Sequence, residues 1–262
     1  MRGAETRGWA VAIPSTEHVA LPAPHGRSLP LRDPAVVINP SLQADVPYDL
    51  FRDLTCVTII SSSPLVVVAG PSQPFQTMQG LVEHGRARPG QLSFASAGVG
   101  TTPHLAGELL NLRTGIAATH VPYRGIAAAM PDLISGTVPF TFSSIAGARG
   151  LIADGSLRAL ATTGTTRPTA LPAVPTMAEA GFADFVVDLW LGVFVPAATP
   201  AATVAALQAA LQRVLQRPET AAAFARSGAE VRFTTSAEAE RTLRAEFAMW
   251  RDLIATQRLT AG

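Results

Sequence analysis

The chain has 262 residues, of which 48% are apolar, so it is long enough to bury the core of one large domain or of two smaller lobes. Its formal net charge is +1 and only 15% of its residues are charged, which excludes the basic surface that recruits nucleic acid or anionic lipid. All 20 basic residues are Arg, so chemistry that needs a lysine, such as a Schiff base or a Walker phosphate loop, is excluded as well.

Cysteine and histidine usage argues against a bound metal. Cys56 is the single cysteine, so there is no disulfide framework and no cysteine-based metal site. It lies in an apolar run, where we expect a buried and unreactive thiol. The five histidines show no metal-ligand spacing.

No apolar segment approaches the roughly 18 residues that a membrane-spanning helix needs, so direct membrane insertion is not expected.

Residues 1–35 are expected to form an irregular leader, because prolines interrupt every short apolar run there. The apolar patch at residues 9–13 is ended by Pro14, which makes it too short for a secretory signal. As written, the sequence carries no legible export signal, and we expect a cytoplasmic location if the sequence is complete.

From residue 36 onward the pattern becomes regular. Strand-like runs occupy residues 36–38, 55–61 and 65–69, and a helix is expected to begin near Pro74. Further strands are expected at residues 91–95, 118–121, 138–142 and 157–162, with helices between them at residues 103–113, 127–134 and 146–153. Strands that alternate with helices through short glycine-bearing loops indicate βαβ units and a parallel sheet.

The last third of the chain is expected to be mostly helical. A proline-rich loop with a short helix near Met177 leads into an apolar run at residues 185–195, in which Trp190 favours core or hinge packing over a lid on a ligand. Helices are expected at residues 200–215, 218–226 and 236–257, with Ser236 as the N-cap of the last one. The nearby acidic residues are scattered, so a paired-carboxylate site is not expected.

The segment SAGVGTTPHLAGE, residues 96–108, carries the strongest functional signal. It lies where a strand is followed by a helix, so unpaired backbone N–H groups gather at the positive end of the helix dipole, which suits an anion. Ser96, Thr101 and Thr102 add side-chain donors, and Gly98 and Gly100 allow close approach to the backbone. The spacing fits neither a Walker loop nor a dinucleotide fingerprint, so a small carboxylate is favoured.

The same segment has a plainer explanation, which is an ordinary strand-to-helix connection capped by Thr101 or Thr102. His104, just inside the expected helix, is more typical of a capping or packing histidine than of a catalytic one. Arg124 follows the next strand and is equally consistent with a counter-charge for a second carboxylate and with a surface arginine. The residues alone leave these alternatives open.

Together with its neighbours, the segment resembles the periplasmic solute-binding proteins of tripartite tricarboxylate transporters, the Bug or TctC-like receptors. The matching text includes INPSL at residues 38–42, VPYDLFRDLTCVT at 46–58, ARPGQLSFASAGVGTTPHLAGELL at 87–110, HVPYRG at 120–125 and RPTALPAVPTMAEAG at 167–181. These segments follow the family's order along most of the chain.

The resemblance implies an α/β fold of the type II periplasmic-binding-protein kind, with two lobes of parallel-rich sheets joined by a hinge. Residues 36–65 and 191–262 would form the first lobe, here incomplete, and residues 66–190 the second. A small carboxylate would bind between the lobes and pass to the membrane permease of the transporter. The location would be periplasmic, and no metal, cofactor or bond-making chemistry would take part.

Site residues carry over position by position. The resemblance places these residues at the ligand: Ser96, Gly98, Gly100, Thr101, Thr102, His120, Tyr123 and Ser143. A carboxylate held by hydrogen-bond donors needs no balancing cation, since such bonds are charge-assisted. This chain departs from the family at two places. It has Ser143 and Ser144 where the family often carries an aspartate. Residues 1–35 do not match the loop with which the family's first lobe holds the ligand.

Two alternatives remain. One is a truncated or frame-altered relative that folds only in its second lobe and binds no useful ligand. The other is an α/β enzyme acting on a carboxylate or acyl substrate, which would need a nucleophile, a base or a metal set. No such set can be assembled, because the nucleophile-elbow pattern G-x-S-x-G is absent.

Overall fold

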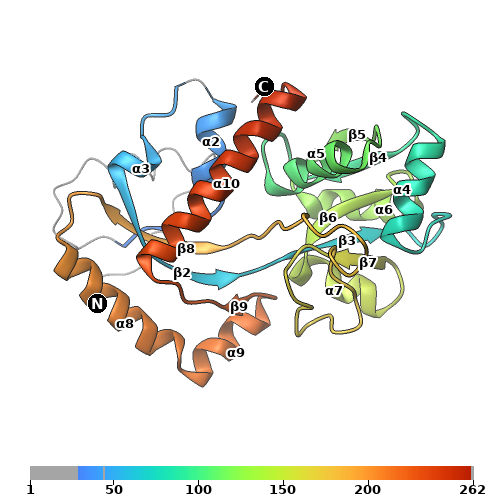
Figure 1. The fold of residues 1–262 in the computed structure, drawn as a ribbon. Coiled ribbons are helices and arrows are strands. Elements are labelled where there is room, and N and C mark those ends of the chain that lie inside the picture. Colours follow the sequence, from blue (N-terminus) through green and yellow to red (C-terminus); the bar gives the residue numbers. More distant parts are fainter. Residues whose placement is uncertain (1–28, 44, 261–262) are drawn as a thin grey trace.

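The computed structural model describes residues 29–43 and 45–260. Within these residues the strands form two sheets, which Figure 1 shows next to each other with helices packed around them. Most of the leader expected at residues 1–35 lies outside the described part. Where it is described, β1 (Leu31–Arg32) pairs with a strand of the first sheet, so the expectation of irregular structure is wrong there.

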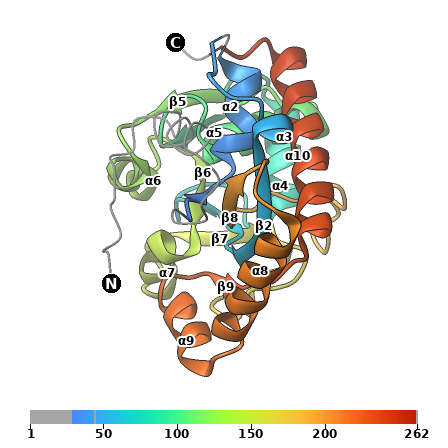
Figure 2. The ribbon, with the colours of Figure 1, turned by 90° about the vertical axis from the view of Figure 1, so that its left-hand side faces the viewer.

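The first sheet has four strands in the order β1-β8-β2-β9, and all its pairs are antiparallel. Apolar and β-branched side chains, which favour strands, fill its two long members. Figure 2 shows α8 and α9 at one end of the molecule, beside β9. The elements here are β2 (Leu54–Ser62), β8 (Leu191–Pro196), β9 (Glu230–Val231), α2 (Ala35–Leu42), α3 (Leu50–Asp53), α8 (Ala201–Leu215) and α9 (Pro218–Arg226).

The second sheet has five strands in the order β5-β4-β6-β3-β7. Strand β4 pairs in parallel with β5 and β6, whereas β3 pairs antiparallel with β6 and β7. The elements are β3 (Leu65–Ala69), α4 (Met78–Ala87), β4 (Ser93–Ser96), α5 (Thr102–Thr114), β5 (Thr119–Pro122), η1 (Ile126–Ala129), α6 (Met130–Ser135), β6 (Phe140–Ser144), α7 (Ile145–Ala153) and β7 (Arg158–Thr162). The expected strand–helix alternation is confirmed here.

Among the described strands, however, parallel pairing joins only β4 to β5 and β4 to β6, which corrects the expectation of a parallel sheet. Parallel neighbours must be joined by a crossover connection, and the helices α5, η1 and α6 supply these crossovers. Strand β3 enters the second sheet directly from β2 and therefore takes the opposite direction. The first sheet contains no βαβ unit among its described strands and is antiparallel throughout.

The strand expected at residues 36–38 is wrong, because these residues lie in helix α2. The Ala35 N–H donates to Asp33 Oδ1 at 3.0 Å, which satisfies one free donor of the first turn. Val36, Val37 and Ile38 are fully or almost fully buried against α10 (Ser236–Gln257) and the core. Tertiary burial therefore overrides the strand preference of three β-branched residues.

Two smaller expectations also need correction. The short helix near Met177 is a single turn, in which the Ala180 N–H donates to the Thr176 carbonyl at 2.9 Å. The N-cap of α10 is Thr235 rather than Ser236. Thr235 and Glu238 form a capping box, and the hydroxyl of Ser236 donates to the Cys56 carbonyl at 2.6 Å instead.

One hydrophobic core runs from the first sheet into the second. It contains Ile59 of β2, Val67 of β3 and Phe94 of β4, and Trp250 of α10 packs into it. Helix α10 contacts α2, β2 and α5, and Figure 1 shows it running along the boundary between the two halves. No helix in the described part of the chain combines the length and apolar character that crossing a bilayer requires.

The chain passes between the sheets twice, once from β2 to β3 and once in the segment that leads from β7 to β8. Asp188 joins the two passages, since its carboxylate accepts from the Ser62 hydroxyl at 2.7 Å and from the Ser63 N–H at 2.6 Å. Arg232 Nη1 lies 3.7 Å from the same carboxylate. The lobe boundaries at residues 65/66 and 190/191 stay a prediction.

Trp190 links the second passage to α10. Its side chain is fully buried, as expected for core packing, and its Nε1–H donates to Glu246 Oε2 at 2.8 Å. Burial raises the pKa of Glu246 to about 7, with Asp188 nearby as a further cause and the Trp190 hydrogen bond opposing it. A carboxyl group with a raised folded-state pKa lowers stability as the pH rises above its unfolded value.

We therefore predict that Glu246→Gln stabilises the protein at pH 8 by about 1–2 kcal/mol, because Gln keeps the acceptor for Trp190 and removes a partly buried charge. The gain should shrink to a small remainder near pH 4.5, the ordinary Glu pKa, where the carboxyl is protonated in the folded chain and about half protonated in the unfolded chain. Urea unfolding at the two pH values measures it, with the exposed Glu83→Gln on α4 as control. An equal effect of Glu246→Gln at both pH values would contradict the prediction.

Candidate functional site

The carboxyl ends of three parallel strands lie at one edge of the second sheet. Strand β4 pairs with β5 through Ser96 and Pro122, and with β6 through Ala95 and Thr141. A polar segment follows each strand, so the register brings the Ser96 loop, Tyr123 and Ser143 to the same edge. Ligands of α/β proteins bind at such strand ends.

The loop between β4 and α5 depends on its two glycines. Gly98 has φ 124° and Gly100 has φ 77°, conformations that other residues rarely adopt. Thr101 takes the N-cap position, but its hydroxyl donates to the Gly98 carbonyl at 2.7 Å and makes no capping bond. Pro103 lies in the first helical turn, where its missing N–H costs nothing. The Thr101 side chain therefore does not cap α5.

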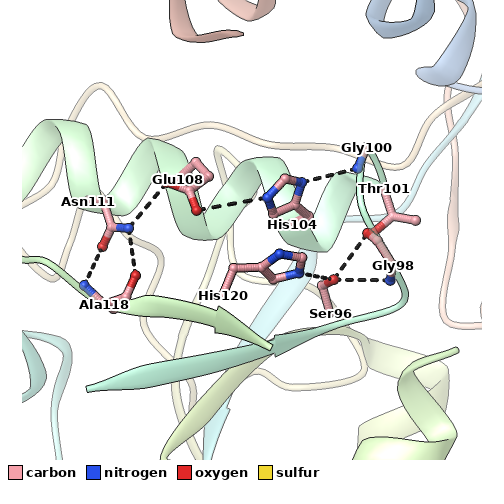
Figure 3. A network of polar contacts seen from close by, with 9 residues as sticks. All are labelled: Ser96, Gly98, Gly100, Thr101, His104, Glu108, Asn111, Ala118 and His120. Carbon is pink, nitrogen blue, oxygen red and sulfur yellow. Dashed lines mark hydrogen bonds and ion pairs between the residues drawn. The ribbon is translucent and has the colours of Figure 1, made fainter. Parts of the chain in front are cut away.

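Ser96 holds the loop from inside, as Figure 3 shows. Its side chain is fully buried. The Gly98 N–H donates to Ser96 Oγ at 3.0 Å, and the hydroxyl also lies 3.1 Å from the Gly98 carbonyl and 2.5 Å from His120 Nε2. All of these partners belong to the protein, so the geometry favours Ser96 as a brace for the loop. A direct contact between Ser96 and a ligand stays a prediction.

His104 holds the other side of the loop. The Gly100 N–H donates to His104 Nδ1 at 3.1 Å, which confirms the expectation of a capping or packing histidine. His104 Nε2 lies 3.8 Å from Glu108 Oε1, one turn further along α5 (Figure 3). Burial, followed by the neighbouring His120, lowers the pKa of His104 to about 4. Burial also lowers the pKa of His120, which favours the neutral form of that ring as well.

Asn111 ties the far side of α5 to the segment that enters β5. Its side-chain amide donates to the Ala118 carbonyl at 2.9 Å and accepts from the Ala118 N–H at 3.0 Å. A weaker contact of 3.3 Å joins Asn111 Nδ2 to Glu108 Oε2. Gly107 lets α5 approach β4, since any Cβ there would overlap the ring of Phe94. These contacts fix the helix, and with it the loop, against the sheet.

Four backbone donors of the loop and the first helical turn have no acceptor in the described part of the chain. They are the N–H groups of Ala97, Val99, Thr102 and His104. Val99 is 49% exposed at the tip of the loop, and Thr102 and His104 begin α5. The N–H groups of Gly98, Gly100 and Thr101, by contrast, are used within the loop. The free donors at a helix start can hold a carboxylate.

The other expected site residues are engaged with the protein. The Tyr123 hydroxyl donates to Asp132 Oδ2 at 2.6 Å, and this bond raises the pKa of Tyr123 to about 12. Ser143 is fully buried and donates to the Ser144 carbonyl at 3.2 Å. Arg124 is exposed. Their roles toward a ligand stay predictions.

The site has little of what a catalyst or a metal centre requires. A nucleophile must be accessible to its substrate, whereas the Ser96 side chain is buried. Cys56 is buried in the core, and burial raises the pKa of its thiol to about 12, so it is unreactive as expected. Within the described residues, no group of three or more His, Cys, Asp or Glu side chains could hold a metal ion.

Comparison with known proteins identifies the family. The profile of the "Tripartite tricarboxylate transporter family receptor" family matches residues 4–259. The chain belongs to this family. Protein BugT of Bordetella pertussis is 35% identical over 197 residues, which are 74% of this chain and 60% of BugT. The chain thus spans less than two thirds of the length of that relative.

Two solved structures support the fold. "R. palustris Rpa4515 with adipate" has a TM-score of 0.78 at 28% identity. The match covers 94% of this chain and 83% of the chain in that structure. "MatC (Rpa3494) from Rhodopseudomonas palustris with bound malate" has a TM-score of 0.75 at 26% identity. This match covers 94% of this chain and 85% of the chain in that structure. The expected periplasmic-binding-protein-like α/β fold is confirmed.

Sequence reasoning missed the roles of Glu108 and Asn111. Their spacing from His104, four and seven positions along α5, places all three on one helix face, which was a usable signal. It did not show that this face meets β5, because that contact depends on the fold of the sheet.

The close approach of α2 to the loop gives a testable prediction. A Cβ at position 100 would lie 2.9 Å from Leu42 Cδ1, and its φ is strained for any side chain. Gly100→Ala should therefore destabilise the protein by about 1–2 kcal/mol. Gly90 has φ 76° with no neighbour within 4 Å, so Gly90→Ala isolates the backbone cost. Denaturant unfolding should show the larger loss for Gly100→Ala, and equal losses would contradict the contact with α2.

Proposed function

We propose that this protein is an extracytoplasmic solute-binding protein that captures a small carboxylate for a tripartite tricarboxylate transporter. The observation that carries the proposal is a group of N–H donors without acceptors among the described residues, those of Val99 in the loop and of Thr102 and His104 in the first turn of α5. Family membership supports it, as do the two related structures that hold adipate and malate. The membrane permease of the transporter would be the partner, and the periplasm the location.

The proposed mechanism is closure of two lobes around the ligand. Residues 36–65 with 191–262 would form one lobe, and residues 66–190 the other. Supporting this division, β2, β8 and β9 of the first sheet lie in the first set of residues, and β3 to β7 of the second sheet lie in the second set except for Leu65 at the start of β3. A ligand that contacts both lobes stabilises the closed arrangement through its extra contacts there, and the permease would recognise that state.

The donor set makes the proposal testable with a matched pair of variants. Thr102→Pro removes the N–H at the first position of α5, where proline is tolerated and the extended Thr101 before it is compatible. Thr102→Val removes only the hydroxyl and keeps the N–H. Because a hydrogen bond to a charged group contributes about 1.5–3 kcal/mol, Thr102→Pro should bind a carboxylate roughly tenfold or more weakly than Thr102→Val.

Isothermal titration calorimetry with malate, adipate, citrate and glutamate measures the affinities. At least one ligand should bind the unsubstituted chain and raise its melting temperature by mass action. A folded sample that binds none of them would contradict the proposed function and favour the non-binding alternative. Turnover of a ligand would favour the enzyme alternative.

A further inference from the structure

Two stacked imidazole rings lie directly beneath the loop, and capture by backbone donors does not by itself explain them. The ring centroids of His104 and His120 are 3.9 Å apart, with an interplanar angle of 29°. Phe94 of β4 flanks the pair, with its ring centroid 5.2 Å from that of His120 and 6.5 Å from that of His104. Each histidine reaches one glycine of the loop, His104 directly and His120 through Ser96 (Figure 3).

The hydrogen bonds define the protonation of His104. A backbone N–H can only donate, so His104 Nδ1, which receives the Gly100 N–H, must carry a lone pair. The ring proton is then on Nε2, the atom that faces Glu108 Oε1 at 3.8 Å. Protonation of Nδ1 would set two N–H groups against each other and release Gly100.

His120 acts on the loop through the Ser96 hydroxyl. This hydroxyl has one proton and two lone pairs, and one lone pair accepts the Gly98 N–H. With the proton of His120 on Nε2, the ring donates to Ser96 Oγ and the hydroxyl donates to the Gly98 carbonyl. That arrangement gives Ser96 Oγ, His120 Nε2 and the backbone N–H and carbonyl of Gly98 each a partner within the protein.

We propose that His104 is a positioning residue for carboxylate capture, whose neutral Nδ1 holds the Gly100 N–H inside the loop, while His120 holds Gly98 through Ser96. This inference rests on the proposed function. With both glycine donors bound internally, the N–H groups left for the ligand include those of Val99, Thr102 and His104. A loop fixed before the ligand arrives loses less conformational freedom on binding, which favours affinity.

The competing explanation is that His104 only fills space between α5 and Phe94. Two variants separate the explanations. His104→Asn places an amide oxygen near the position of Nδ1, so it keeps an acceptor for Gly100 but loses the ring. His104→Phe keeps an aromatic ring in the stack but has no acceptor.

A positioning role predicts that His104→Asn binds malate or adipate at least tenfold more tightly than His104→Phe, whichever of the two ligands the unsubstituted chain binds better. A packing role predicts the reverse order, because the ring is retained only in His104→Phe. Equal affinities of the two variants would also overturn the inference. Unfolding curves of both variants show that each sample is folded before its affinity is compared.

A second readout needs no ligand. Nuclear magnetic resonance of the ring nitrogens should show the Nε2–H tautomer of His104 at pH 7. On acidification the Gly100 amide signal should shift together with the titration of His104, and this step should be missing in His104→Asn. An Nδ1–H tautomer, or a Gly100 amide that does not follow His104, would overturn the inference.

The two proposals fail in different ways. If the unsubstituted chain binds neither malate nor adipate, the proposed function fails, and the positioning role in capture is overturned with it. If the unsubstituted chain binds one of them but the His104 variants show the reversed or equal order, the proposed function stands and only the inference is overturned.

Discussion

The first turn of a helix leaves backbone N–H groups without carbonyl partners, and the arrangement of this site depends on how those groups are satisfied. In the loop before α5, the protein supplies acceptors for the two glycine donors, from Ser96 Oγ and His104 Nδ1. The donors of Val99, Thr102 and His104 are left without acceptors in the described residues. The proposed carboxylate site is therefore the set of loop donors that the protein's own acceptors leave unused.

The rest of the second sheet keeps this loop in place. Parallel pairing of β4 with β5 and β6 brings three strand ends to one edge, and Gly107 lets α5 lie close against Phe94. Asn111 fixes the segment that enters β5. Helix α10 and the continuous core connect this region to the first sheet, and Leu42 of α2 comes close to Gly100. A change in the position of one sheet relative to the other would therefore directly alter the contacts of the loop.

Local patterns predicted the parts of this structure that local interactions determine. Glycines beside hydroxyl residues and a proline identified the loop, and apolar periodicity identified α5, α8 and α10 close to their observed bounds. The helix at Val36–Ile38 was missed because its conformation depends on burial against α10, far away in the sequence. The bond from Trp190 to Glu246 joins residues 56 positions apart and has no local signature. Internal use of the Gly98 and Gly100 donors could not be predicted, because it depends on where β5 places His120 and how α5 orients His104.

The most direct test of the central claim is the response of individual backbone amides to a carboxylate. Amide chemical shifts of the nitrogen-15-labelled protein, followed during titration with malate or adipate, measure it residue by residue. We expect the largest shifts on Val99, Thr102 and His104, whose N–H groups have no acceptor in the part of the chain that the structure describes. Saturable shifts confined to another part of the molecule, with these three amides unchanged, would contradict it.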